Sequence, residues 1–257
     1  MCDKSMSLFQ RLLSVFHNTY GYENRSRKIM IEGTINAIMS YGSSVFAHKI
    51  EAHRKIIDMM HRKMVIACGR MYRTVPYLTA CCITGIFPLR LAMEKAAVLY
   101  CLRKKLNLPQ NCNRHELPPP LSKPSAVKRR LEASSIKIWQ TWYDNTPTGQ
   151  WTKKLLPIVS TTSVPGVDFY LAQGLTGHGC FKAYLQKMNR SSTSRCGCGG
   201  LQTAEHILTE CSLFADGRPG RLDLSRNSSR AYIRDAVRRL WAAEAAEAAA
   251  GTATNQA

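Results

Sequence analysis

The feature that most constrains the fold is a short run of potential metal ligands toward the C-terminal end. Cys196, Cys198, His206 and Cys211 supply three thiols and one imidazole within sixteen positions. Zinc prefers a closed tetrahedral shell of sulfur and imidazole nitrogen, which leaves no position for a reacting water. The pattern therefore predicts one structural zinc ion and a small CCHC zinc module. The Cys-x-Cys pair is shorter than the usual two-residue spacing, and the alternative is buried cysteines beside a capping histidine.

Two neighbouring features offer other chemistry. Glu205 beside His206 could act as an acid or base next to a metal, but that requires an open coordination position, and the four ligands fill the shell. His178 and Cys180 lie in a glycine-containing stretch, Leu175 to Phe181, where a tightly packed loop is favoured over an auxiliary metal site.

The remaining cysteines and the hydropathy indicate the compartment. The chain has ten cysteines in 257 residues and no secretory signal before them, which favours a reducing environment without a disulfide framework. No apolar run reaches the roughly 18 residues needed to cross a bilayer. We expect a protein that is neither secreted nor membrane-spanning.

Charge indicates the partner. Lys and Arg total 36 against 17 Asp and Glu, a net charge of +19, which favours a polyanion, and nucleic acid first. The alternative for any single cation is an ordinary solvated face, and the alternative for Lys128-Arg129-Arg130 is a charged start to the next helix. The basic residues that we expect to contact phosphates are Arg62, Lys63, Arg70, Arg73, Lys128, Arg129 and Arg130.

Periodicity predicts a mainly α-helical protein in four parts. Residues 1–106 have a helical pattern, and residues 107–128 form a linker rich in proline (Pro118, Pro119, Pro120 and Pro124). Residues 129–222 form a second helical region that contains the zinc module at 196–211. Residues 223–257 form a C-terminal helix with an alanine-rich tail that we expect to fray.

Helix boundaries follow from local breakers. Pro76 and Pro88 each predict the start of a helix, and Gly69 predicts the end of one. In the helix before Gly69, apolar residues spaced three and four apart predict a core stripe beneath a cationic face; they are Ile56, Met59, Met60, Met64, Ile66 and Ala67. We expect Trp139 and Trp142 in the second helical region to pack.

Several motifs, taken in order, resemble a known family. They are residues 173–181 (QGLTGHGCF), Tyr184-Leu185 and the cysteine and histidine series. This order is similar to the C-terminal end of the pol polyproteins of arthropod non-LTR retrotransposons, the type-1 elements that insert into ribosomal RNA genes. Residues 38–42, 72–75 and 85–89 resemble the thumb-like region after the polymerase palm. The resemblance covers Tyr20 to Leu222.

The resemblance implies a parent polyprotein with RNA-directed DNA polymerase and endonuclease activity. A polymerase palm holds two magnesium ions on clustered aspartates, whereas this chain has no adjacent aspartates and no Tyr-x-Asp-Asp motif. We therefore expect a C-terminal fragment, with no catalytic residues, in which residues 1–106 form the thumb-like region. Magnesium is expected only in the parent's palm.

The implied partners are element RNA, target DNA and the RNA/DNA template-primer duplex. The implied location is the nucleus at integration and the cytoplasm during synthesis. Leu201 and Phe214 are candidates for contacts with bases, or simply cover the metal site. The alternative function is a non-enzymatic zinc adaptor that binds protein, which would respond little to salt.

Overall fold

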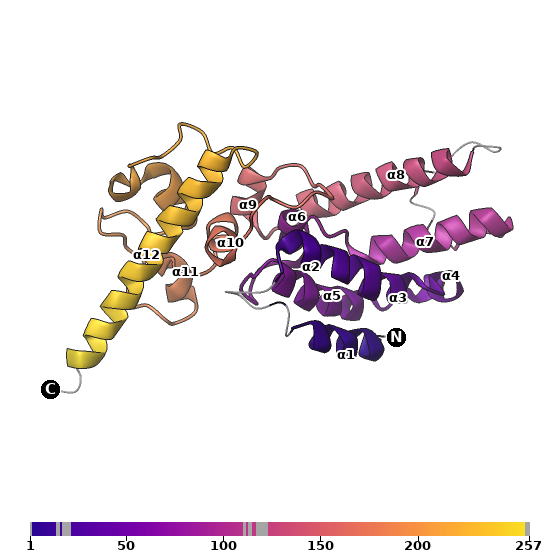
Figure 1. Cartoon of the computed structure of the whole chain (residues 1–257), viewed down its shortest axis with the longest axis horizontal. Helices are drawn as coiled ribbons and strands as arrows, with labels where there is room; N and C mark the ends of the chain where they lie inside the picture. The colour runs from indigo at the N-terminus through magenta and orange to yellow at the C-terminus, as the bar shows by residue number, and fades with distance from the viewer. Residues whose placement is uncertain are drawn as a thin grey trace. The chain divides into compact units, whose positions relative to one another are not determined.

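The computed structural model describes residues 2–13, 16, 22–109, 112, 115, 116 and 123–254, with side chains as far as residue 246. Nearly all of its regular structure is helical (Figure 1). Within the described residues no β-strand occurs, and a single antiparallel bridge joins Arg195 to Leu201. The prediction of a mainly α-helical protein is confirmed.

The chain divides into two compact units. Unit 1 comprises Met1–Cys68, Pro76–Thr148 and Ile158–Ser163. Unit 2 comprises Gly69–Val75, Gly149–Pro157 and Val164–Ala257. In the part of the chain that the structure describes, no helix is long and apolar enough to cross a bilayer.

Unit 1 contains the longer run of helices. They are α1 (Cys2–Leu12), α2 (Asn24–Met30), η2 (Ile31–Asn36), α3 (Ala37–Ser40), α4 (Ser43–Phe46), η3 (Ala47–Lys49), α5 (Arg54–Cys68), α6 (Tyr77–Thr84), α7 (Leu89–Lys104) and α8 (Pro124–Asn145). Among them α5, α6 and α7 pack on one another, as do α7 and α8.

Prolines and glycines set the helix boundaries of unit 1 as predicted. Pro76 and Pro88 immediately precede α6 and α7. Gly85 ends α6 at a φ of +64°, a left-handed conformation that favours glycine. A Cβ at Gly85 would lie 2.5 Å from the backbone nitrogen of Ser163, so this glycine also lets segment 158–163 approach.

The core stripe of α5 is only partly as predicted. Met60, Met64 and Ile66 are buried, but Ile56 and Met59 are 52% and 60% exposed. The prediction is wrong for these two residues, because the helix turns a different face toward α6 and α7. Ile56, Met59 and Lys63 fall on one side of the helix at spacings of three and four.

Helix α8 starts at Pro124, inside the predicted linker. Pro118, Pro119 and Pro120 lie outside the described residues. The helices on either side of them, α7 and α8, both belong to unit 1. The role of residues 107–128 as a domain boundary stays a prediction.

The two tryptophans of α8 pack as predicted. Trp139 is fully buried, with its ring centroid 5.6 Å from that of Phe87. The Trp142 ring lies 4.4 Å beneath the Arg90 guanidinium. Through these two contacts α8 packs against α7 and against the turn that precedes α7.

Unit 2 is built around its last helix. Its helices are α9 (Gln150–Leu155), α10 (Phe169–Thr176), α11 (Lys182–Lys187), η5 (His206–Glu210), η6 (Ser212–Phe214) and α12 (Asn227–Thr254). Helices α10 and α12 pack closely, since a Cβ at Gly174 would lie 2.3 Å from Ile233 Cγ2. The fraying of the alanine-rich end stays a prediction.

Candidate metal centre and basic surfaces

A tight turn carries the first two cysteines of the candidate centre. The Cys196 amide donates to the Gly200 carbonyl at 2.8 Å, and the Gly199 amide donates to the Cys196 carbonyl at 2.8 Å. Gly199 has a φ of +91°, which a residue with a side chain rarely adopts. The turn therefore folds back within four residues and places Cys196 and Cys198 on the same side.

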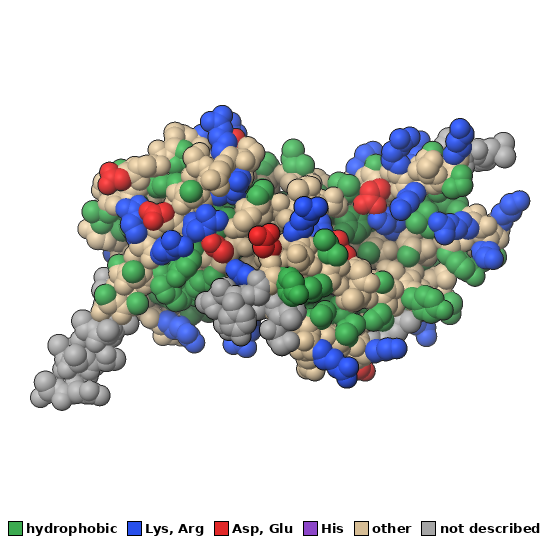
Figure 2. Space-filling view, viewed as in Figure 1, with side chains coloured by type: hydrophobic (Ala, Val, Ile, Leu, Met, Phe, Trp, Pro, Cys, Tyr) green, Lys and Arg blue, Asp and Glu red, His purple; other side chains and the backbone are tan. Residues whose placement is uncertain are grey.

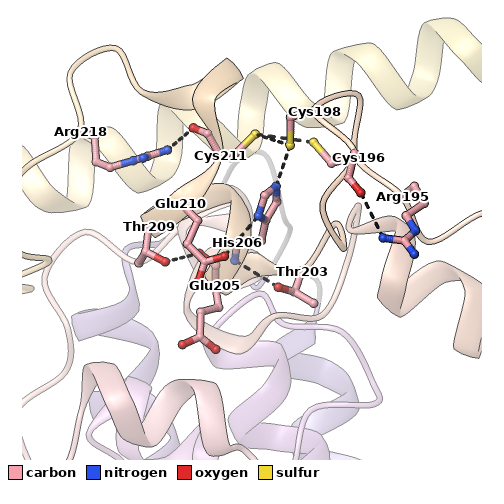
Figure 3. A network of polar contacts seen from close by, with 11 residues as sticks. Arg195, Cys196, Cys198, Thr203, Glu205, His206, Thr209, Glu210, Cys211 and Arg218 are labelled. Carbon is pink, nitrogen blue, oxygen red and sulfur yellow. Dashed lines mark hydrogen bonds and ion pairs between the residues drawn. The ribbon is translucent and has the colours of Figure 1, made fainter.

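A short helix supplies the other two ligands. The Thr203 hydroxyl accepts a hydrogen bond from the His206 amide at 3.1 Å and so caps the start of this turn. The Cys211 amide donates to the His206 carbonyl at 2.8 Å, which closes the helix at its end. His206 and Cys211 therefore lie one helical turn apart and face the cysteine turn (Figure 3).

The four ligand atoms converge. All lie within 4.8 Å of one another. Cys211 Sγ is 3.6 Å from both Cys196 Sγ and Cys198 Sγ, and Cys198 Sγ is 3.1 Å from His206 Nε2. Zn–S bonds of about 2.3 Å at tetrahedral angles place two sulfurs roughly 3.8 Å apart. The set has the dimensions and the donor types of a tetrahedral zinc site, so these residues could hold one metal ion.

The two glutamates beside His206 point in different directions. Glu210 Oε2 lies 3.4 Å from His206 Nδ1, which leaves Nε2 to face the sulfurs. Such a carboxylate on the far nitrogen orients a metal-binding imidazole. Glu205 instead forms an ion pair with Lys154 at 2.5 Å and points away from the ligand set (Figure 3).

The thiols of the set differ in acidity. The Gly200 backbone hydrogen bond, together with neighbouring side-chain bonds, lowers the pKa of Cys198 to about 7. Burial raises the pKa of Cys211 to about 11. A metal ion binds thiolates, so the lowered pKa of Cys198 favours the form that binds a metal, whereas Cys211 would release a proton on binding.

Close packing at Gly200 and hydrogen bonding from helix α12 stabilise the segment that carries the candidate ligands. A Cβ at Gly200 would lie 2.5 Å from His206 Cε1, so only glycine leaves room for this ring. The Tyr232 hydroxyl of α12 donates to the Phe214 carbonyl at 2.8 Å, and its oxygen lies 3.5 Å from the Leu208 carbonyl oxygen. Helix α12 thus holds both sides of the segment that carries Cys211.

The alternative ligands upstream have other partners. His178 Nδ1 lies 2.9 Å from the Thr74 hydroxyl. Cys180 is buried, and burial raises the pKa of its thiol to about 12. Among the described residues, the CCHC set is the one group of three or more ligating side chains that converges on a common point.

The seven predicted phosphate-binding residues fall into three groups. Arg62 and Lys63 lie on α5 of unit 1. Arg70 and Arg73 lie in the segment of unit 2 that follows α5. The third group, Lys128-Arg129-Arg130, lies in the first turns of α8. The first and third groups therefore belong to unit 1 and the second to unit 2, and their contacts with phosphates stay a prediction.

Sequence reasoning missed a second basic run at the same end of the α7–α8 pair. The Lys95–Glu132 ion pair and the Arg90–Trp142 contact show that these two helices run antiparallel. Arg103, Lys104 and Lys105 end α7, and α7 packs against α8, which begins at Pro124. Figure 2 shows Lys and Arg side chains gathered around the free ends of both helices. We call these six residues the α7–α8 tip: Arg103, Lys104, Lys105, Lys128, Arg129 and Arg130. The run at 103–105 was visible in the sequence, but its pairing with 128–130 required the helix packing.

Comparison with known proteins gives the chain's relatives. It is 29% identical over 215 residues to the putative 115 kDa protein in type-1 retrotransposable element R1DM of Drosophila melanogaster. It is 26% identical over 228 residues to the retrovirus-related Pol polyprotein from type-1 retrotransposable element R1 4 of Nasonia vitripennis. The chain is a relative of the pol polyproteins of arthropod type-1 R1 elements. The predicted resemblance is confirmed.

The R1 relatives are longer than the matched region. The alignments cover 80% and 84% of this chain but 21% of the Drosophila protein and 56% of the Nasonia protein. A third relative, the R1 Pol polyprotein of Bradysia coprophila, is 26% identical over 84% of this chain and 22% of its own length. No family model matches the chain, and no solved structure matches it.

Proposed function

We propose that this chain is a zinc-stabilised, nucleic-acid-holding part of an R1-type retrotransposon polyprotein. Cys196, Cys198, His206 and Cys211 bind one structural zinc ion. Basic side chains hold element RNA, target DNA or the RNA/DNA template-primer duplex by the phosphates, and these contacts are independent of sequence.

The observation that carries the proposal is the convergence of the CCHC set in a chain with R1 relatives. Four side chains with the donor types that zinc prefers lie within 4.8 Å of one another. A closed shell of this kind stabilises a fold and leaves no position for catalysis. The module is therefore assigned a structural and binding role.

The phosphate contacts are assigned to the three basic groups. The α7–α8 tip extends the predicted group at Lys128 by the three cations that end α7. Beside the metal site, Leu201 is 50% exposed and the Arg239 guanidinium lies 5.2 Å above the Phe214 ring. The apolar groups could contact an unpaired base, and the cationic group could contact the adjacent phosphate.

Catalysis is assigned to the parent polyprotein. Its RNA-directed DNA polymerase and endonuclease activities, and the magnesium ions that they need, would belong to other parts of the parent. This chain has seven aspartates, none adjacent to another, and no catalytic residue is proposed in it. The polyprotein would work in the nucleus at the integration site, after synthesis in the cytoplasm.

The second candidate function is a zinc adaptor that binds protein. The exposed apolar side chains of α5, Ile56 and Met59, favour it, because they suit an apolar partner. Salt distinguishes the two functions, since phosphate contacts weaken steeply with salt and an apolar interface does not.

Metal content tests the zinc assignment. Elemental mass spectrometry of the purified chain should give one zinc per chain, and the Cys198→Ser variant should lose it. Cys180→Ala serves as the matched control and should retain the zinc. Absence of zinc from the unaltered chain would refute the assignment.

Salt dependence tests the nucleic-acid assignment. Replacing Lys128, Arg129 and Arg130 by glutamine should lower the slope of log affinity against log salt by about 2 to 3. A control that replaces three exposed cations elsewhere in unit 1, namely Arg25, Lys49 and Lys55, has the same net charge and should lower the slope by less than about 1. Equal slopes for the two triple variants would contradict a specific role for the tip.

A further inference from the structure

Unit 2 contains a group of aromatic rings that its core does not cover. The Phe169 ring centroid lies 5.8 Å from that of Tyr72, 5.6 Å from that of Tyr170 and 5.2 Å from that of Trp241. Trp241 is 36% exposed, and the other three rings are half-buried. We call these four residues the aromatic strip. Rings packed in the core of the same unit, such as Phe181, are fully buried.

Cations border the aromatic strip. The Arg238 guanidinium lies 5.1 Å above the Tyr170 ring and is exposed. Its neighbour Arg239 pairs with Asp235, whereas Arg238 forms no ion pair among the described residues. Exposed Arg73 follows Tyr72 directly. Arg190 lies near enough to oppose the rise that burial causes in the pKa of Tyr72, which reaches about 12.

A polar cluster lies beside the Tyr72 end of the strip. The Thr74 hydroxyl lies 2.9 Å from His178 Nδ1 and 2.6 Å from the Tyr184 hydroxyl, and the rings of His178 and Tyr184 are 4.9 Å apart. Tyr184 also acts electrostatically on Tyr72. This cluster adds hydrogen-bonding groups next to the rings.

We propose that the aromatic strip is a stacking site for single-stranded nucleic acid, with Arg73, Arg190 and Arg238 neutralising the adjacent phosphates. An aromatic side chain can stack on a base only when that base is unpaired. We therefore expect this site to bind single strands more tightly than duplexes. An apolar protein partner would bury the exposed Arg238 guanidinium without supplying an acidic group to pair with it. The site goes beyond the proposed function, because neither the zinc ion nor the basic helices require these rings.

Fluorescence anisotropy tests the stacking site. The full, zinc-loaded chain is titrated into labelled oligo(dT), oligo(U) and a duplex of the same length. Trp241→Leu should weaken single-strand binding about ten-fold or more and duplex binding less than about two-fold. Trp241→Phe retains a ring and should restore most of the affinity. The ratio between the oligo(dT) and oligo(U) losses shows which strand the site prefers.

Controls separate stacking from folding. Tyr41→Leu removes an 80% exposed ring from unit 1 and should leave single-strand affinity unchanged. Arg238→Gln removes a cation without touching the core, so it remains informative if Trp241→Leu loses its zinc or its fold. It should weaken single-strand binding three-fold or more and reduce the salt slope by about 1.

The outcomes also distinguish this inference from the proposed function. An unaltered chain that binds no nucleic acid refutes both. Normal binding by the unaltered chain together with full affinity in Trp241→Leu and Arg238→Gln refutes the stacking site alone. An equal loss on duplex and single strand, or a loss that Trp241→Phe does not restore, also overturns it.

Discussion

The helical core of unit 1 and the CCHC segment of unit 2 differ in how much apolar surface they bury. Unit 1 buries long apolar side chains between helices, and Met64, Ile83 and Leu91 have no exposed surface. The zinc module of unit 2 has a much smaller core, with Ile207 and Leu208 beneath four converging ligands. A short segment that buries so little needs another source of folding free energy, which a zinc ion bound as proposed would supply. Damage to the CCHC segment should therefore leave the core of unit 1 intact.

Metal removal should have the largest effect, and it should be confined to unit 2. We expect Cys211→Ser, or chelation of the unaltered chain, to unfold the module, because metal binding to such modules contributes roughly 10 kcal/mol or more. Hydrogen exchange followed by mass spectrometry should show loss of protection over residues 196–214, with α5 to α7 unchanged. Equal loss of protection in α5 to α7 would show that the units do not fold independently.

Substitution of Gly85 should destabilise unit 1 in the way that metal removal should destabilise the CCHC segment. Alanine there would meet the backbone of residues 161–163 and would be strained at a φ of +64°. We expect Gly85→Ala to lower the free energy of unfolding by about 2 to 4 kcal/mol in urea denaturation, without loss of zinc.

Gly33 provides the matched control for Gly85. It lies inside η2, and a Cβ there would meet nothing within 4 Å. Gly33→Ala should stabilise unit 1 by about 0.5 to 1 kcal/mol. A destabilisation of similar size at both glycines would contradict the assignment of the Gly85 effect to its contact with residues 161–163.

Acid should act on unit 1 through His61. This residue is fully buried, and burial lowers its pKa from 6.5 to about 3. In the unfolded chain this histidine is protonated below about pH 6.5, whereas in the folded chain it stays neutral down to about pH 3. The free energy of unfolding therefore falls as the pH decreases from about 6.5 to about 3. Between pH 7 and pH 5 the loss should be about 2 kcal/mol.

His61→Gln isolates this contribution. His61 Nδ1 lies 2.8 Å from the Tyr77 hydroxyl, and a glutamine amide can keep a hydrogen bond to it without titrating. Urea unfolding at the two pH values should show a smaller pH dependence in the variant. The same dependence in both proteins would assign the acid sensitivity to other groups.

Local sequence signals predicted the helix starts at Pro76 and Pro88 and the grouping of the four candidate ligands. Pro76 and Pro88 act through their own backbone restrictions, so the starts of α6 and α7 could be read without knowledge of packing. The four ligands lie within one short segment, and their spacing alone predicts that they converge.

Long-range packing could not be read in the same way. Ile56 and Met59 have helical spacing, but which face of α5 is buried depends on where α6 and α7 lie. The aromatic strip joins Tyr72, Phe169 and Trp241 from three distant parts of the sequence. The local sequence around each of these aromatic residues does not distinguish it from a residue of the buried core.

The contact of Tyr232 with the zinc module has a genetic consequence. Its hydroxyl donates to the Phe214 carbonyl and lies beside the Leu208 carbonyl, and these two residues flank the last candidate ligand, Cys211. A premature stop codon between Cys211 and Asn227 would leave all four ligands encoded but would remove this support. Degenerate copies of such an element could thus keep an intact zinc motif and still have lost the folded module.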